Sequence, residues 1–204
     1  WPDNVQLALE LEDTGRRAEA VPATVAVIAG ELCVGLGQPQ LEAIARGHFV
    51  KVAAADLGPL MAVGGNGATT VSATAYAAAR AGIRLFATGG IGGVHRGDAW
   101  DVSSDLTTLA TEPDCVVSAG AKAHLDLPRT LEYLETLGVP VIGYGTGELP
   151  AFYTRRSGLS LQHRVDSPMQ AAALLRTHFA LHPRRGMVLC NPISEVAALD
   201  DGLV

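Results

Sequence analysis

Hydrophobic and polar positions divide the chain into two alternating kinds of segment. Short apolar runs rich in β-branched residues predict strands, and longer stretches with apolar residues at helical spacing predict helices. The predicted strands cover 23–29, 49–53, 83–88, 115–119, 139–144 and 186–190. The predicted helices cover 2–18, 39–46, 71–81, 103–110, 128–137 and 167–181. Near-continuous apolar strands separated by helices favour an α/β fold with α/β/α layers around a mostly parallel central sheet.

Two glycine-rich loops lie where such a fold binds ligands, beyond the carboxyl ends of strands. The first loop, 64–70, leads into the helix predicted at 71–81. Its glycines let backbone N–H groups approach an anion, and Thr69 and Thr70 can hold a phosphate or cap the helix. A tight turn with an ordinary cap is the alternative, and the P-loop pattern is absent.

The second glycine-rich loop, 88–97, directly follows the strand predicted at 83–88. Its glycines indicate backbone packed closely against a ligand or against another backbone segment. His95 and Arg96 stand at the end of this loop, where they place a titratable ring beside a fixed cation. This pair suits a phosphate monoester.

An acidic segment follows the second loop. Asp101 and Asp105 are four residues apart, with Ser103 and Ser104 between them. Two carboxylates on one side of a helix start, with a hydroxyl nearby, can hold a hard divalent ion such as Mg²⁺ or Mn²⁺. The alternative is that Asp101 or Ser103 caps a helix and that Asp105 is solvated.

Composition and charge exclude several classes of protein. Hydrophobic residues make up 48% and charged residues 18% of 204 residues, which indicates a folded chain with a single domain over 1–204. The formal charge of −6 argues against binding nucleic acid by charge alone, and the apolar runs are too short to cross a membrane. Cys33, Cys115 and Cys190 are widely spaced in apolar runs, which predicts reduced, buried thiols of a cytoplasmic protein.

Lysine is scarce in this chain, with two lysines against thirteen arginines. Lys51 and Lys122 each lie at or just past a predicted strand. Arginine stays protonated, whereas a desolvated lysine can lose its proton and attack a carbonyl carbon to form an imine. The alternative is that two solvated lysines are an accident of small numbers.

Seven motifs, in this order and spacing, resemble those of the pseudouridine-5′-phosphate glycosidases, a family that includes relatives named for indigoidine biosynthesis. The motifs are NGATTV, ATGGIGGVHRG, D-x-S-x-D-L, AGAK, LEYLETLGVPVIGY, LPAFY and NPI. The resemblance runs over essentially the whole chain. It implies a homotrimeric enzyme that depends on a divalent metal, typically Mn²⁺. Such an enzyme reversibly cleaves the C–C bond between uracil and ribose in pseudouridine 5′-phosphate.

The resemblance also implies roles for individual residues. Lys122 of AGAK is the nucleophile that forms an imine with the ribose, and Asp101 is the metal ligand, with water in the remaining positions. The residues implied in substrate binding are Lys51, Thr70, Val71, Ser103, Ser104 and Asp105, with His95 and Arg96 at the phosphate or in the region of ring opening.

The chain departs from the family pattern at both ends. The family has an N-terminal segment whose glutamate donates a proton, and this segment would precede Trp1. The family also continues beyond the NPI motif with a helical portion, whereas this chain stops at Val204. We therefore expect that terminal portions of the family domain are lacking here. The alternative function is a catalytically inactive domain that binds a sugar phosphate or nucleotide and partners a kinase.

Overall fold

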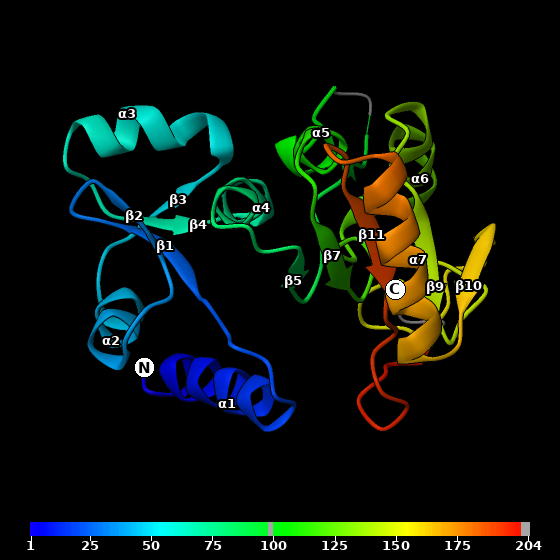
Figure 1. Ribbon diagram of the computed structural model, residues 1–204, viewed down its shortest axis with the longest axis horizontal. Helices are drawn as coiled ribbons and strands as arrows, with labels where there is room; N and C mark the ends of the chain where they lie inside the picture. Colours follow the sequence, from blue (N-terminus) through cyan, green and yellow to red (C-terminus); the bar gives the residue numbers. More distant parts are fainter. Residues whose placement is uncertain (98–99, 201–204) are drawn as a thin grey trace. The chain divides into compact units, whose positions relative to one another are not determined.

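The computed structural model describes residues 1–97 and 100–200, and it divides the chain into two compact units. The N-terminal unit covers Trp1–Ala77, and the C-terminal unit covers Ala78–Val204. Figure 1 shows both units, and each is described by itself below. The sequence predicted a single domain over 1–204, and the division into two compact units does not test that prediction.

The N-terminal unit contains a four-stranded sheet of order β2-β1-β4-β3. Its strands are β1 (Val25–Ile28), β2 (Glu31–Val34), β3 (Val50–Val52) and β4 (Gly67–Thr69). Strand β1 pairs antiparallel with both β2 and β4, and only β3 runs parallel to β4. The segments predicted as strands at 23–29 and 49–53 thus belong to a separate, mixed sheet. The first glycine-rich loop also contributes a strand, which its sequence did not predict.

A tight hairpin explains why β2 was missed. Ala29 and Gly30 join β1 to β2, and both have positive φ angles, 48° and 80°. Two consecutive residues of positive φ match the right-handed twist of paired strands and reverse the chain at once. The pair Ala-Gly is a weak signal for such a turn, because the favoured first residues are Asn, Asp and Gly.

Helices cover both faces of this mixed sheet. They are α1 (Asp3–Arg17), α2 (Gln38–Arg46), the 3₁₀ turn η1 (Ala54–Asp56), α3 (Leu57–Ala62) and α4 (Val71–Arg80), the last of which continues into the C-terminal unit. On one face Ala26 of β1 packs with Val5 and Leu41, from α1 and α2. On the other face Val27 packs with Leu57 and Ala73, from α3 and α4.

The C-terminal unit contains a five-stranded sheet of order β10-β9-β11-β7-β5, and all its pairs are parallel. Its strands are β5 (Leu85–Ala87), β7 (Cys115–Ser118), β9 (Val141–Tyr144), β10 (His163–Val165) and β11 (Met187–Cys190). Every residue of the central β11 is buried, as expected for a strand covered on both faces. This sheet confirms the predicted α/β fold with a mostly parallel central sheet.

Three helices of the C-terminal unit begin with side-chain caps. They are α5 (Ser104–Thr111), α6 (Leu127–Thr136) and α7 (Pro168–Leu181). Ser103, Asp126 and Ser167 each accept a hydrogen bond from a backbone N–H in the first turn of the helix that follows. Helix α7 lies along the sheet, and its Ala171 packs in the core with Ile142 and Met187 (Figure 1).

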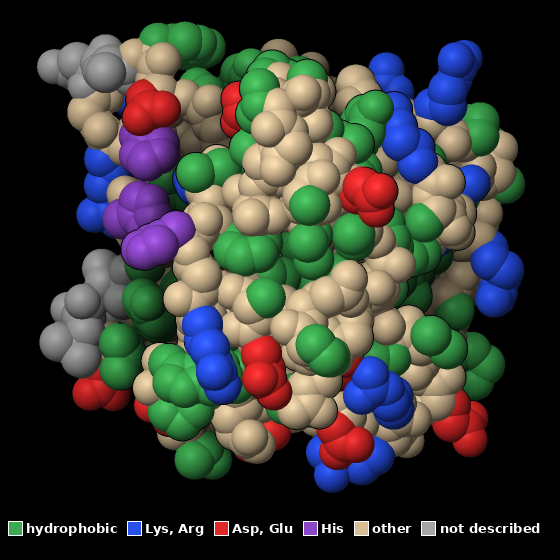
Figure 2. All heavy atoms as spheres, turned by 90° about the vertical axis from the view of Figure 1, so that its left-hand side faces the viewer, with side chains coloured by type: hydrophobic (Ala, Val, Ile, Leu, Met, Phe, Trp, Pro, Cys, Tyr) green, Lys and Arg blue, Asp and Glu red, His purple; other side chains and the backbone are tan. Residues whose placement is uncertain are grey.

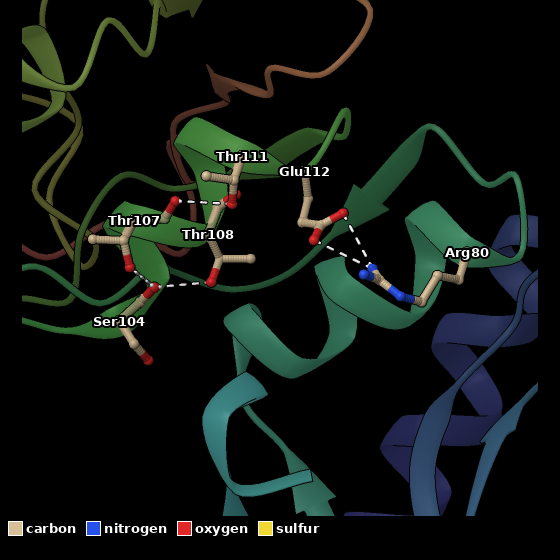
Figure 3. Close-up of polar contacts among 6 residues, drawn as sticks. All are labelled: Arg80, Ser104, Thr107, Thr108, Thr111 and Glu112. Carbon is tan, nitrogen blue, oxygen red and sulfur yellow. Dashed lines mark hydrogen bonds and ion pairs between the residues drawn. The ribbon is translucent and has the colours of Figure 1, made fainter. Parts of the chain in front are cut away.

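Helix α5 is rich in threonines whose hydroxyls donate back to backbone carbonyls one turn earlier. Thr107 and Thr108 both donate to Ser104 O at 3.0 Å (Figure 3). Beyond the helix, Glu112 pairs with Nη1 of Arg80 at 3.2 Å. The pair of Arg80 and Glu112 ties the end of α4 to the segment that leads into β7.

Asp114, next to β7, is the most unusual buried group. Its side chain is 1% exposed, and neither carboxylate oxygen has a hydrogen-bond partner among the described residues. Burial, together with the negative charge of Glu112, raises the pKa of Asp114 from its ordinary 3.8 to about 7, although Arg84 opposes the shift. The carboxyl is therefore largely protonated below neutral pH.

The cysteines agree with the sequence prediction in part. All three cysteines are free; Cys115 and Cys190 are buried, while Cys33 is only partly so. Burial raises the pKa of both the Cys115 and the Cys190 thiol to about 12. In the part of the chain that the structure describes, no helix combines the length and apolar character needed to span a bilayer. On the face shown in Figure 2, basic and acidic side chains are interspersed.

Candidate active site

Two loops beyond the carboxyl ends of β5 and β7 run side by side and hold Lys122. Ala119 N donates to Gly89 O at 3.0 Å, Ile91 N donates to Gly120 O at 3.1 Å, and Lys122 N donates to Ile91 O at 3.1 Å. This ladder fixes the backbone of Lys122 at the edge of the sheet where α/β proteins bind ligands. The Lys122 side chain is partly buried.

The glycines of the second loop leave room for neighbouring side chains. A Cβ on Gly90 would lie 2.5 Å from Cε2 of Phe152, and a Cβ on Gly92 would lie 2.2 Å from Oγ of Ser103. Either contact is too short for a real side chain. The close approach predicted for these glycines therefore takes place against side chains of the same unit.

The acidic segment is arranged differently from the predicted shared metal site. Ser103 caps α5 by accepting from Asp105 N at 3.2 Å, so the cap alternative holds for Ser103. Asp105 is buried, and its Oδ2 accepts from Gly92 N at 2.8 Å, so the expectation that it is solvated is wrong. Ser104, the first residue of α5, is exposed.

Asp101 lies outside the helix, beside His95. Its side chain is 66% exposed, and its Oδ2 lies 3.8 Å from Nδ1 of His95. The backbones of the two residues are also joined, because His95 N donates to Asp101 O at 2.9 Å. The ring of His95 lies 5.5 Å from that of His124, measured between centroids. Among the described residues, no group of three or more His, Cys, Asp or Glu side chains gathers that could hold a metal.

Arg96 reaches across to the turn that follows Lys122. Its Nε donates to Leu125 O at 3.2 Å, and its Nη2 donates to Ala123 O at 3.0 Å. Leu125 N in turn donates to Lys122 O at 3.0 Å. The assignment of Arg96 to the substrate phosphate stays a prediction, and the structure gives the guanidinium two partners within its own chain.

The remaining predicted residues lie in the N-terminal unit, around β3 and β4. Lys51 is exposed on β3, opposite Ala68 in the register with β4. Thr70 N donates to Val52 O at 2.9 Å, and the Thr70 hydroxyl lies 2.9 Å from that of Ser72. Val71, the first residue of α4, is buried. The roles of Lys51, Thr70 and Val71 in substrate binding stay predictions.

A cavity of about 490 Å³ opens in the C-terminal unit beyond the carboxyl ends of β5, β7 and β11. Its lining consists of Ala87, Thr88, Gly89, Val117, Ser118, Ala119, Phe152, Tyr153, Asn191, Pro192, Ile193 and Ser194. No side chain in this lining is charged in the described part of the chain, so the cavity suits an uncharged, partly apolar group with hydrogen-bonding edges.

None of these lining residues was predicted as a site residue, and three of them offer specific contacts, namely Thr88, Phe152 and Asn191. Phe152 has a positive φ of 67°, and its N–H donates to Ala119 O at 3.1 Å, which holds its ring beside Gly90. A bulky residue rarely adopts this conformation, and such strain is concentrated at binding and catalytic sites. The sequence could have pointed to Asn191 through its position, because Asn191 directly follows the end of β11, where α/β proteins bind ligands.

Comparisons with known proteins place the chain in a family. The family model described as "Indigoidine synthase A like protein" matches residues 1–204. A pseudouridine-5′-phosphate glycosidase of Caldanaerobacter subterraneus is 50% identical over 203 residues, which cover 98% of this chain and 66% of that protein. Another glycosidase of the same name, from Herpetosiphon aurantiacus, is 54% identical over 207 residues, which cover 100% of this chain and 68% of that protein.

Two solved structures share the fold. An indigoidine synthase A-like protein from Thermotoga maritima superimposes with a TM-score of 0.90 at 32% identity, covering 96% of this chain and 66% of that one. The prealnumycin C-glycosynthase AlnA, solved in complex with ribulose 5-phosphate, superimposes with a TM-score of 0.91 at 42% identity, covering 96% and 65%. The chain thus spans about two thirds of the length of these relatives.

Proposed function

The chain belongs to the indigoidine synthase A-like protein family, and from this premise we propose that it is a pseudouridine-5′-phosphate glycosidase. It would cleave the C–C bond between uracil and ribose reversibly. The relatives at 50% and 54% identity bear that name, and the similar solved structure of a C-glycosynthase concerns the same class of bond.

The placement of Lys122 is the observation that carries this proposal. Its backbone is fixed between the two loops beyond β5 and β7, and its side chain is partly buried. A carbon leaving group departs poorly from an intact sugar ring, so the reaction needs a nucleophile that can form an imine. Lysine can do so and arginine cannot.

The proposed reaction balances through Lys122. The neutral amine bonds to C1′ of the ribose while the bond from C1′ to the ring oxygen breaks. The nitrogen, now an ammonium, gives up a proton and regains its lone pair, and the ring oxygen takes up a proton. The nitrogen lone pair then forms an iminium as the bond from C1′ to uracil breaks. The electron pair of that bond passes to the uracil carbon, which is protonated. Water adds to C1′ and releases ribose 5-phosphate and the free amine.

We assign the uncharged cavity of about 490 Å³ to the uracil base. The amide of Asn191 offers both a donor and an acceptor, which matches the alternating N–H and C=O groups of a pyrimidine edge. Thr88 and Ser118 add hydroxyl groups to the lining. The phosphate, in contrast, is best held by positively charged side chains, and none of the described residues that line this cavity carries one.

Asp101 is the residue proposed to hold a divalent ion, with Mn²⁺ as the expected metal. Its exposed carboxylate fits this role, because hard cations such as Mg²⁺ are often held by one or two carboxylates and several waters. When bound, the ion would supply positive charge that stabilises negative charge developing on oxygen. As in the family resemblance, we also propose a homotrimer.

Reductive trapping tests the proposal. The full chain is incubated with ribose 5-phosphate and borohydride, and the adduct is located by peptide mass spectrometry. We expect covalent modification of Lys122 and its complete loss in Lys122→Arg, which keeps the charge but cannot form the imine. The matched variant Lys51→Arg should retain the adduct.

Absence of an adduct in the wild-type chain would favour an inactive sugar-phosphate-binding domain. An adduct on Lys51 that persists in Lys122→Arg would move the nucleophile to the N-terminal unit. Release of uracil from pseudouridine 5′-phosphate, followed by chromatography, provides the second readout.

A further inference from the structure

We infer that Arg96 is a positioning residue that fixes the turn carrying Lys122, rather than a ligand of the substrate phosphate. The inference deepens the proposed function and rests on it for its catalytic consequence. It concerns the segment from Lys122 to Asp126, which follows the nucleophile and leads into α6.

The guanidinium of Arg96 holds two carbonyls of this segment at once. Nε and Nη2 form one edge of the planar group, and they donate to Leu125 O and Ala123 O at 3.2 and 3.0 Å. In the same segment Leu125 N donates to Lys122 O, and this hydrogen bond closes the turn. A rigid fork that binds both carbonyls limits rotation of the turn and therefore of the Lys122 backbone.

A second arginine, Arg129, joins the same two segments through other contacts. Nη1 of Arg129 donates to Gly97 O at 2.9 Å, next to Arg96. Nε of Arg129 also lies 3.4 Å from Oδ2 of Asp126, whose Oδ1 accepts from Arg129 N at 3.0 Å. Strands β6 (Val94–His95) and β8 (Leu125–Asp126) pair antiparallel, with Val94 opposite Asp126 and His95 opposite Leu125. The two strands and two arginines thus tie the 94–97 segment to the 123–126 segment.

The same contacts argue against a phosphate on Arg96. The edge formed by Nε and Nη2 is one that binds phosphate in a bidentate manner, and here two carbonyl oxygens accept from it. Phosphate binding at this edge would break both bonds and release the turn that holds the nucleophile. The contacts therefore favour a role in geometry.

The inference predicts a defect in turnover rather than in binding. A displacement of about 1 Å at a reacting group can cost on the order of a hundredfold in rate. In Arg96→Met we expect kcat for pseudouridine 5′-phosphate to fall about 10- to 100-fold while KM changes by less than about threefold. Arg96→Lys should show a smaller fall, because lysine lacks the fork that holds two carbonyls.

Three measurements on the full chain separate positioning from phosphate binding. The first is the split between kcat and KM in Arg96→Met, with Arg164→Met as control, since Arg164 of β10 pairs with the exposed Asp166 just beyond that strand. The second is the preference for pseudouridine 5′-phosphate over pseudouridine, which should stay as in the wild type. The third is hydrogen exchange at the amides of Lys122 and Leu125, which should become faster, together with partial rescue of turnover by millimolar guanidinium.

The contrary results are equally definite. A rise in KM above about tenfold, with loss of the preference for the phosphorylated substrate, would make Arg96 a phosphate ligand and overturn the inference. Unchanged exchange at Lys122 and Leu125 would also overturn it, whatever the activity. Failure of the proposed function would be recognised separately, because the wild-type chain would then release no uracil, while the exchange measurement would still decide the role of Arg96.

Discussion

The two units build their sheets in different ways, and the difference determines where their reactive groups lie. In the five-stranded sheet of the C-terminal unit every strand pair is parallel, so the carboxyl ends of β5, β7 and β11 share one edge, with the cavity and Lys122 beyond it. In the N-terminal unit β1 runs antiparallel to β2 and β4, so strand ends alternate between edges, and Lys51 lies within strand β3. Loops of a parallel sheet converge, whereas those of a mixed sheet disperse.

Buried carboxylates reveal a second contrast. Glu12 in the N-terminal unit is 6% exposed, but it accepts from Nη2 of Arg16 and from the hydroxyl of Thr24, both at 2.7 Å. Asp114 in the C-terminal unit is 1% exposed and has no such partner among the described residues. A partnered carboxylate can stay charged inside a protein, whereas an unpartnered one is stable only when protonated.

The largest expected effect is on the pH dependence of stability, and it tests this second contrast. Because the pKa of Asp114 is raised from 3.8 to about 7, the folded state holds its proton more tightly than the unfolded state. The stability that this provides is fully present below about pH 4 and is lost as the pH rises to about 7, at up to about 1.4 kcal/mol per pH unit and about 4 kcal/mol in total. Asp114→Asn should remove this slope from urea unfolding measured between pH 4 and 8.

Glu12→Gln is the matched variant for this experiment. It removes the charge that Arg16 pairs with, so it should lower stability at pH 7 by about 1–3 kcal/mol. Between pH 4 and 7 the stability of the wild-type chain should fall more steeply than that of Asp114→Asn. Equal slopes would contradict the raised pKa of Asp114.

The second effect concerns the divalent ion that we propose for Asp101, in the C-terminal unit. Asp101→Asn should weaken Mn²⁺ binding by at least about tenfold, since a neutral amide is a poorer ligand for a hard cation. Calorimetric titration of the full chain measures this, with Asp13→Asn in the N-terminal unit as control. Undiminished affinity in Asp101→Asn would require another ligand.

The smallest expected effect is the loss of stability when a helix cap is removed. Helices α5, α6 and α7 have side-chain caps, whereas α1 and α2 have none at Pro2 and Gly37. Ser167→Ala should cost about 1 kcal/mol of unfolding free energy, because Gln170 N loses its partner. Ser167→Asp, which keeps an acceptor, should stay within a few tenths of the wild type. Equal stability of both variants would show that this cap contributes nothing.

The same caps explain how far the fold could be predicted. Pro128 at the start of α6 and Ser167 before Pro168 at the start of α7 are local signals, so both helices were predicted to within a residue or two at each end. The mixed sheet escaped prediction because its order depends on contacts between distant segments. No local pattern indicates that Val27 pairs with Gly67 rather than with a strand of the parallel sheet.

Prediction of the candidate site was limited in the same way. Glycine spacing and the scarcity of lysine pointed to the two loops around Lys122, because both are properties of single segments. The contacts of Arg96 with Ala123 and Leu125 link residues far apart in sequence, and a charge beside a glycine-rich loop favoured the phosphate interpretation instead. Asn191 and Phe152 join the cavity only through the fold.

The two buried thiols make the chain convenient to label with a single dye. At neutral pH a thiol whose pKa is about 12 is ionised in only about one molecule in 10⁵, and only the thiolate reacts with common alkylating reagents. Cys115 and Cys190 are therefore chemically silent in the folded protein, while Cys33 on β2 is partly accessible. A fluorophore added to the native chain would accordingly report on the hairpin of the N-terminal unit, without any engineered substitution.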